Sequence, residues 1–510
     1  MGHTQQAATT AASSATADEP LRVPLLPEEL RRPAATVCVT GATGYVAGPI
    51  IARLLAAGHR VRATARDTSP HQPAVVALLA LPGAPERLQL FPADLLQPGS
   101  FDAAVAGCDA VIHTASPFAL SVSRSQVRRL LLEPAVHGVE NVIGEWLPPP
   151  AGALRAVNRS PTVRRLVLTS SIAATCSRAD DHQPHRRRHR KAAPSAGAAA
   201  STTTTALTNG AARGSSGELD PLLREAAATA VAPPDGPAAS AGRGGDAGDG
   251  DTMIDERHWN TTASEAFLPY SWSKTEAERR AWELAGRQDM WRLVTVLPGF
   301  VLGPCVGGGA GRSRSESVML LQRLCEGAMW PAAPNMGLAT ADVRDVAAAH
   351  CRAALLPGAS GRYLVVGGGT RMWRLTAALA DLYPGGAVRR SVAVAPRALV
   401  AALGPAVLRL GSDVVEATWG APPRFSTRRA AEDLGLRSWV PLEESLRDMV
   451  EDLAAKGLVR HPLSCSPGGR SRRRGGRVLG KQVAWLLALG LGTLLAVALA
   501  IAAVLRRLRA

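Results

Sequence analysis

Short runs of apolar and β-branched residues alternate along the chain with segments of helical periodicity. Seven of these runs are expected to form strands: Thr36–Thr40, Arg60–Ala65, Leu88–Phe91, Ala110–His113, Leu166–Thr169, Leu293–Leu297 and Tyr363–Val366. Between the first two, a glycine-rich turn at 41–48 leads into a predicted helix over Pro49–Ala57. Strands that alternate with helices predict an α/β fold with a doubly wound parallel sheet.

Two stretches of low complexity interrupt this pattern. The first 33 residues are rich in Ala and Thr, and we expect them to form a disordered arm. Residues 177–251 contain a basic run, four consecutive threonines and a glycine-rich tract. Such a segment has too few large apolar side chains to offset the entropy lost on ordering, so we expect a disordered insertion. One domain is therefore predicted over 34–462, followed by a basic linker at 463–482.

The chain ends in an apolar segment, Val483–Leu505, that contains no charged residue. At ~1.5 Å per residue such a helix spans ~34 Å, enough for a ~30 Å hydrocarbon core, so we expect a transmembrane helix. The basic flank before it is the heavier one, which favours a large N-terminal domain on the cytosolic side and a C-terminal tail anchor. Small residues spaced four apart form a stripe through which two anchors could pack as a homodimer. The sequence does not indicate which organelle carries the anchor.

The net charge of +16 raises the question of nucleic-acid binding. Fourteen basic residues lie, however, in three short segments at 186–191, 470–481 and 506–509. The rest of the chain is close to neutral, so nucleic acid is not an expected partner. The seven cysteines include no Cys-x-x-Cys pair, which favours reduced thiols in a cytosolic setting, and no metal site is expected.

The turn after the first predicted strand reads Gly-Ala-Thr-Gly-Tyr-Val-Ala-Gly from Gly41 to Gly48. Glycines let the backbone approach a pyrophosphate, and the following helix N-terminus supplies N–H groups and a positive dipole. We therefore expect Gly41, Gly44, Tyr45 and Ala47 to contact a dinucleotide. Taken alone, this motif is also compatible with a tight turn that binds nothing.

The end of the second predicted strand distinguishes between the two nicotinamide cofactors. An acidic residue there would bond the ribose hydroxyls of NAD, whereas this strand ends in Arg66, with Asp67 following. Arg66, assisted by Arg62, would pair with a 2′-phosphate through charge-assisted hydrogen bonds. The sequence thus favours NADPH, the alternative being that Arg66 is a solvated surface residue.

A tyrosine and a lysine stand four residues apart at Tyr270 and Lys274, on one face of a predicted helix. Carbonyl reduction needs a proton donor, and a neighbouring ammonium favours the phenolate that tyrosine leaves behind. Ser171 closes a predicted strand at the edge where parallel sheets bind ligands. Its hydroxyl can orient a substrate oxygen.

Together these motifs resemble the extended short-chain dehydrogenases/reductases, in the branch of dihydroflavonol 4-reductase, cinnamoyl-CoA reductase and aldehyde/ketone reductases. The resemblance extends from Thr36 to Val459, without the insertion. It includes three further segments, Ile112–Pro117, Leu297–Pro304 and Asp342–His350.

The resemblance implies a Rossmann-like domain with a smaller C-terminal substrate lobe, from about Cys305 through Leu458. It implies that NADPH transfers a hydride to an aldehyde or ketone, with Ser171, Tyr270 and Lys274 as the catalytic triad. The positions implied to contact the cofactor, besides those of the turn and Arg66, are Asp94, Leu95, Ala115, Lys274, Pro298, Gly299 and Phe300.

Two departures from the family pattern stand out. Ala47 replaces the last glycine of the turn, and 99 positions separate Ser171 from Tyr270 because the insertion lies between them. Two other functions remain open: a membrane-bound 3β-hydroxysteroid or sterol dehydrogenase, and a non-catalytic NADP-binding scaffold. The anchor favours a lipophilic substrate without identifying it.

Overall fold

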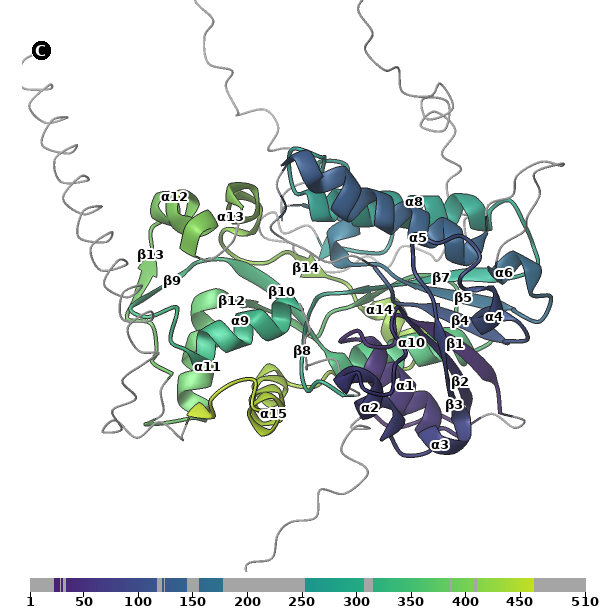
Figure 1. The fold of residues 1–510 in the computed structure, drawn as a ribbon. Coiled ribbons are helices and arrows are strands. Elements are labelled where there is room, and N and C mark those ends of the chain that lie inside the picture. Colours follow the sequence, from purple (N-terminus) through teal and green to yellow (C-terminus); the bar gives the residue numbers. More distant parts are fainter. Residues whose placement is uncertain are drawn as a thin grey trace, which may run out of the picture. The chain divides into compact units, whose positions relative to one another are not determined.

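A computed structural model describes residues 23–27, 29–30, 34–116, 122, 124–144, 156–177, 253–306, 315–385, 388–407 and 411–462. All seven predicted strands form within this part, and they pair in parallel in one sheet of order β11-β7-β5-β4-β1-β2-β3 (Figure 1). Their bounds are β1 Thr36–Thr40, β2 Arg60–Ala65, β3 Leu88–Pro92, β4 Ala110–His113, β5 Arg165–Thr169, β7 Arg292–Pro298 and β11 Gly361–Val365. The predicted α/β, Rossmann-like sheet is confirmed.

The direction of strand addition reverses between β1 and β4. From β1 the chain adds β2 and β3 on one side, and from β4 it adds β5, β7 and β11 on the other. In open parallel sheets ligands bind outside the carboxyl ends of the strands at such a reversal. The turn after β1 and the end of β4 therefore lie at the expected cofactor crevice.

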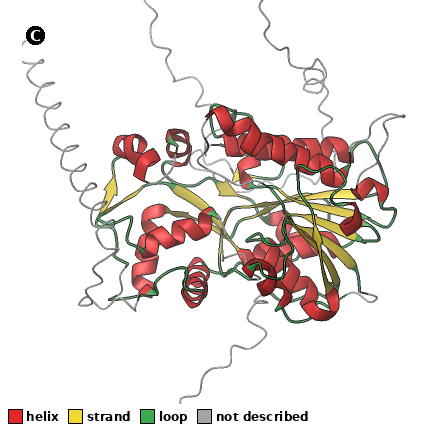
Figure 2. Cartoon of the chain, in the orientation of Figure 1, coloured by secondary structure: helices red, strands yellow, loops and turns green. Residues whose placement is uncertain are grey.

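Helices cover both faces of this sheet (Figure 2). On one face α1 (Ala47–Ala56) packs on α10 (Val343–Leu355), and on the other α5 (Glu133–Ile143) packs on α8 (Pro269–Ala285). Because both faces are covered, the central strands consist of near-continuous buried apolar residues. Shorter helical elements of the same domain are α2 Pro73–Leu79, α3 Ala84–Arg87, α4 Asp102–Val105, η2 Arg124–Gln126, η3 Arg128–Leu132, α6 Ala156–Arg159, η4 Ile172–Ala174 and α14 Arg428–Asp433.

A smaller lobe with its own apolar core follows β7, as predicted. Its sheets are β12-β10-β8 and β13-β9, and a separate two-stranded sheet, β14-β6, includes a strand that precedes β7. These strands are β6 Met253–Ile254, β8 Phe300–Leu302, β9 Ala332–Pro334, β10 Gly337–Asp342, β12 Gly368–Arg371, β13 Ala393–Ala395 and β14 Arg424–Phe425. The lobe helices are α9 Glu316–Cys325, α11 Met372–Leu382, α12 Arg397–Val407, α13 Ser412–Thr418 and α15 Leu442–Ala455.

The sequence predicted a lobe formed by one continuous segment from Cys305 to Leu458. The structure shows that the lobe is discontinuous. The chain returns to the nucleotide-binding sheet to form α10 and β11, whose residues belong to the core of that domain. Gly299 lies at the crossing point, where a Cβ would come 2.6 Å from the carbonyl oxygen of Ala339. Only glycine allows the junction between β7 and β8 to approach β10 this closely.

The described residues of the N-terminal arm, 23–27 and 29–30, contact the domain, and the rest of the predicted disordered arm lies outside the described residues. The Glu29 side chain is 1% exposed and its Oε1 accepts a hydrogen bond from Arg53 Nε of α1 at 2.6 Å. Glu29 Oε2 accepts from Arg352 Nε of α10 at 2.9 Å. No local pattern indicated this contact, because the two arginines lie far along the chain from the glutamate.

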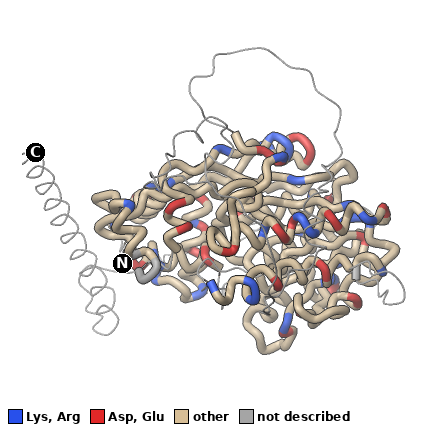
Figure 3. Tube along the Cα trace, turned by 90° about the horizontal axis from the view of Figure 1, so that it is seen from above, with Lys and Arg blue, Asp and Glu red and all other residues tan. Residues whose placement is uncertain are grey.

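The predicted insertion at 177–251, except for Ser177, lies outside the described residues, as do the linker and the apolar segment Val483–Leu505. Within the described part, no helix is both long enough and apolar enough to cross a membrane. Basic and acidic residues are interspersed along the described chain (Figure 3), in keeping with the near-neutral balance expected for the domain.

Candidate active site

The carboxyl end of β5 carries two consecutive serines. Ser171 has extended backbone dihedrals and its Oγ accepts the N–H of Ala173 at 3.2 Å, which caps the short helix η4. The neighbouring Ser170 is buried and donates to Glu278 Oε2 at 2.6 Å. The strand end is therefore fixed on both sides of the peptide bond that joins the two serines.

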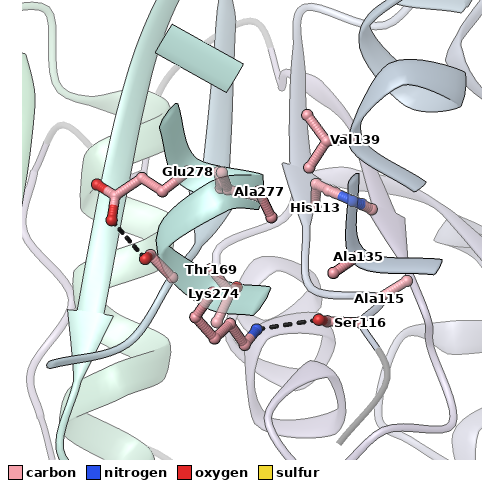
Figure 4. Close-up of a pocket in the computed structure, with 11 residues that line it drawn as sticks. His113, Ala115, Ser116, Ala135, Val139, Thr169, Lys274, Ala277 and Glu278 are labelled. Atoms are coloured by element: carbon pink, nitrogen blue, oxygen red, sulfur yellow. Dashed lines mark hydrogen bonds between the residues drawn. The ribbon is translucent and has the colours of Figure 1, made fainter. Parts of the chain in front are cut away.

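Helix α8 brings Tyr270 and Lys274 to this edge. It begins at Pro269, directly after Leu268, which is the one non-glycine residue of the described chain with positive φ, at 54°. The Leu268 N–H donates to Asp413 Oδ2 of the lobe at 2.9 Å, so a contact from α13 supports this strained backbone. Lys274 Nζ lies 6.0 Å from the centre of the Tyr270 ring and donates to Ser116 Oγ at 3.0 Å (Figure 4).

The electrostatics of the site suit a proton donor next to a cation. Burial raises the pKa of Tyr270, while its hydrogen bond with Ser171 lowers it. The phenol is consequently protonated at neutral pH. Burial lowers the pKa of Lys274 to about 8, and the Glu278 carboxylate opposes that shift. Ser171, Tyr270 and Lys274 thus lie together at this edge of the sheet.

Two buried histidines at the same sheet edge are neutral. Burial, together with the charge of Lys274, lowers the pKa of His113 to about 3, and its Nδ1 lies 2.7 Å from Thr40 Oγ1. Burial lowers the pKa of His350 to about 4. His350 Nδ1 lies 2.7 Å from the Val346 carbonyl, which can only accept, so its Nε2 accepts from Thr169 Oγ1 at 2.7 Å.

The glycine-rich turn fits a pyrophosphate. Gly41 has φ +70°, and a Cβ there would come 3.0 Å from Cα of Ala115, so the turn and the end of β4 touch backbone to backbone. Helix α1 starts at Ala47 with neither a side-chain cap nor an acidic residue in its first turn. Its N–H groups can therefore serve an anion.

Tyr45 was expected to contact a dinucleotide, but its side chain contacts the lobe instead. Its side chain is buried in the core of the lobe, and its hydroxyl donates to the Gly303 carbonyl at 2.7 Å. Only the Tyr45 backbone is left for a cofactor. The side chain instead joins the turn to the segment after β8.

Arg62 and Arg66 are separated rather than paired, because Arg62 lies within β2 and Arg66 follows the last residue of that strand. Arg66 is exposed at the carboxyl end of the strand, and Asp67 beside it accepts hydrogen bonds from Ser69 N–H and Gln72. Arg62 lies nearer the start of the strand, where its guanidinium donates to the Ala106 carbonyl and faces the Phe91 ring at 5.8 Å. Arg66 is the one that lies where a 2′-phosphate contact is expected.

The remaining predicted contacts follow two strands of the sheet, β3 and β7. Asp94 follows β3 and its Oδ1 accepts the N–H of Leu96 at 2.8 Å. The Leu95 carbonyl accepts from Asn141 Nδ2 of α5 at 2.6 Å, which leaves the Leu95 side chain against Gly138. Pro298 ends β7, and the Gly299 N–H donates to the Val365 carbonyl at 3.0 Å before Phe300 opens β8.

A small pocket lies beside Lys274. It is lined by His113, Ala115, Ser116, Ala135, Val139, Leu168, Thr169, Ser170, Lys274, Ala277 and Glu278 (Figure 4). Sequence reasoning missed Ser116 and Glu278. The signal for Glu278 was its position four residues after Lys274, since a carboxylate on the buried face of a helix needs a special partner.

The chain is similar to known proteins over most of its length. Residues 41–207 match the NAD(P)H-binding domain family. The chain is 30% identical over 424 residues to a cinnamoyl-CoA reductase of Medicago truncatula, covering 82% of this chain and 96% of that protein. It is 29% identical to tetraketide alpha-pyrone reductase 1 of Arabidopsis thaliana, covering 68% and 81%.

Among solved structures, the fold is similar to Gre2 of Candida albicans in complex with NADPH, with a TM-score of 0.55 and 23% identity over 82% of this chain and 99% of that one. Vestitone reductase from alfalfa gives a TM-score of 0.51 at 21% identity, covering 83% and 100%. The chain belongs to the extended short-chain dehydrogenases/reductases. Within them it falls in the dihydroflavonol-reductase-like branch, whose members include NAD(P)H-dependent reductases.

Proposed function

We propose that this chain is an NADPH-dependent reductase that converts an aldehyde or ketone into the alcohol. The observation that carries the proposal is the convergence of Ser171, Tyr270 and Lys274 at the carboxyl edge of the sheet, beside a turn that fits a pyrophosphate. The names of the relatives support a carbonyl substrate, because they describe reductases of cinnamoyl-CoA and of a tetraketide alpha-pyrone.

The residues of the site have separate roles in this reaction. When bound, the cofactor supplies the hydride that reduces the carbonyl carbon. Tyr270 donates the proton to the carbonyl oxygen, and Ser171, which is hydrogen-bonded to Tyr270, orients that oxygen. Lys274 holds the ribose and stabilises the phenolate as the proton leaves, since a nearby cation favours the charged form of tyrosine.

The preference for NADPH over NADH rests on Arg66. No hydrogen bond or ion pair within the described chain engages its guanidinium, and it is exposed at the end of β2. Asp67, the nearest acidic alternative, accepts two hydrogen bonds inside its own loop, which also lower its pKa. A guanidinium suits a doubly charged phosphate better than a ribose diol.

A screen of the purified full-length chain in detergent tests this function. NADPH oxidation is followed with aliphatic and aromatic aldehydes, aryl ketones, flavanonols, acyl-CoA thioesters and sterols, each repeated with NADH. We expect turnover with at least one aldehyde or ketone and a preference for NADPH. Tight NADPH binding with no turnover of any carbonyl would instead identify a cofactor-binding scaffold, and NAD-linked oxidation of a sterol would identify a dehydrogenase.

We also propose that the apolar segment Val483–Leu505 attaches the enzyme to a membrane with the catalytic domain in the cytosol. The support is the length and lack of charge of that segment and its basic flanks. Membranes washed with alkaline carbonate should retain the chain, and protease added outside intact organelles should remove the catalytic domain. Protection of that domain would contradict the proposed orientation.

A further inference from the structure

Glu278 lies one helical turn after the catalytic lysine on α8. It follows Lys274 by four residues and Tyr270 by eight, so the three side chains share one face of the helix. Its side chain is fully buried, at 0% exposure. A buried carboxylate is costly unless it is paired and hydrogen-bonded, and every contact of Glu278 described below is made with an element that builds the site.

The Glu278 carboxylate joins α8 to three neighbouring strands. Oε2 accepts from Ser170 at the end of β5, at 2.6 Å. Oε1 accepts from Thr295 Oγ1 of β7 at 2.8 Å and from Arg362 Nε of β11 at 2.8 Å. The helix that carries Tyr270 and Lys274 is therefore tied to the residue that precedes Ser171.

Arg362 is itself held in place, which makes the anchor rigid. Its Nη1 donates to the carbonyls of Glu256 and His258, both at 2.7 Å. Its guanidinium also lies 3.9 Å from the centre of the Trp259 ring, within the range of a cation–π contact. Arg362 and Ser170 thus fix Glu278 from two sides.

Glu278 is also the negative charge that acts on Lys274. The titratable groups that face the ammonium are Tyr270 and Glu278 of α8 and His113 of β4. Tyr270 is protonated and His113 is neutral at neutral pH. Glu278 raises the pKa of Lys274 against the effect of burial, and its own pKa is lowered by the facing Arg362 and hydroxyl groups.

From these contacts we infer that Glu278 is a positioning residue of the reaction, which aligns Ser171 with the Tyr270–Lys274 turn of α8 and keeps Lys274 in its ammonium form. The inference rests on the proposed reductase function. It assigns two separable effects to one carboxylate. The hydrogen bonds fix the geometry, and the charge sets the pH range in which the lysine can assist Tyr270.

The test replaces the charge and keeps the shape. In Glu278→Gln the amide can still contact Ser170 and Thr295, because hydroxyl groups can donate or accept. We expect the alkaline limb of the pH profile of carbonyl reduction to move about one pH unit lower, and activity at pH 8 to fall about fivefold, since a charge within several ångströms is worth roughly one pKa unit or more. An alkaline limb that coincides with wild type would overturn the inference.

Three further variants separate charge from structure. Glu278→Asp keeps the charge and should retain the wild-type limb even where kcat falls. Glu276→Gln, on the same helix but 37% exposed, should change neither quantity. If Glu278→Gln alone does not fold, Glu278→Gln combined with Arg362→Gln removes the uncompensated arginine, and its limb should also lie about one unit below wild type.

A second readout does not depend on turnover. The rate at which Lys274 reacts with an amine-specific reagent, followed by mass spectrometry across pH, reports the pKa of that lysine directly. We expect a midpoint near 8 in the wild-type protein and a lower midpoint in the Gln variants. An inactive wild type that shows this shift would count against the proposed function only, and an active wild type without it would count against the role of Glu278.

Discussion

Two buried carboxylates hold arginines on opposite faces of the same sheet. Glu29 binds Arg53 of α1 and Arg352 of α10, and its side chain is 1% exposed. Glu278 binds Arg362 of β11 and its side chain is 0% exposed. The two carboxylates are buried to nearly the same extent and have similar ion-pair geometry. Glu29, however, fastens a terminal segment to two helices, whereas Glu278 connects the strands and the helix that carry the candidate triad.

The difference shows that burial of a charge does not by itself identify a functional group. Removing one member of a buried ion pair is destabilising wherever the pair lies in the fold, because the charge of the other member is left without compensation. What distinguishes Glu278 is that its charge acts on Lys274, whose pKa burial lowers to about 8. A change at Glu29 should therefore affect folding alone, and a change on the α8 face should affect catalysis.

The largest effect is expected on the α8 face itself. Tyr270→Phe removes the proton donor and keeps the ring, so turnover should fall by roughly 10²- to 10⁴-fold, the range for general acid catalysis. NADPH binding, measured by fluorescence titration, should persist. Retention of more than a few per cent of activity would show that another group supplies the proton.

Glu29→Gln should have its effect on stability instead. It leaves Arg53 and Arg352 buried around a neutral amide, which should cost about 3–5 kcal/mol of unfolding free energy. Denaturant unfolding measures this loss. The pH profile of the remaining folded enzyme should coincide with wild type, and a shifted alkaline limb would remove the contrast with Glu278.

The third prediction concerns Arg66, an exposed arginine whose removal should affect cofactor binding. Arg66→Ala should weaken NADPH binding by about 1.5–3 kcal/mol, the range for hydrogen bonds to charged groups, and leave NADH binding unchanged. Stability should change little, because the side chain is exposed. Arg62→Ala is the matched control: its guanidinium bonds the Ala106 carbonyl, so NADPH affinity should be retained. Equal losses for both cofactors would exclude a 2′-phosphate contact.

The sequence predicted those parts of the molecule that depend on local pattern. Strands appeared as apolar runs between turns, and Tyr270 and Lys274 appeared through helical spacing. Arg62 and Arg66 share a strand face, but four residues at ~3.3 Å each separate them by ~13 Å, so only one can lie at the strand end. The Tyr45–Gly303 and Glu278–Arg362 contacts were missed because their partners are 258 and 84 residues apart. Such contacts depend on strand order, which local pattern does not contain.

The smallest effect concerns two histidines that share burial but differ in surroundings. His113, 2% exposed, lies beside Lys274, whereas His350, 0% exposed, bonds a backbone carbonyl and a threonine. Their pKa values are lowered from 6.5 to about 3 and about 4. Below pH 6.5 the folded protein therefore binds fewer protons than the unfolded chain, and stability present above that pH is lost as the pH falls.

Between pH 7 and 5.5 each histidine should contribute about 1 kcal/mol to this loss, because both folded pKa values lie below that range. His113→Asn and His350→Asn should each flatten the pH dependence of unfolding free energy by that amount, measured by urea unfolding at several pH values. The two variants should agree in stability yet differ in activity, since only His113 lines the pocket beside Lys274. A flattening seen in one variant alone would mean that the site, and not burial, sets the titration of that histidine.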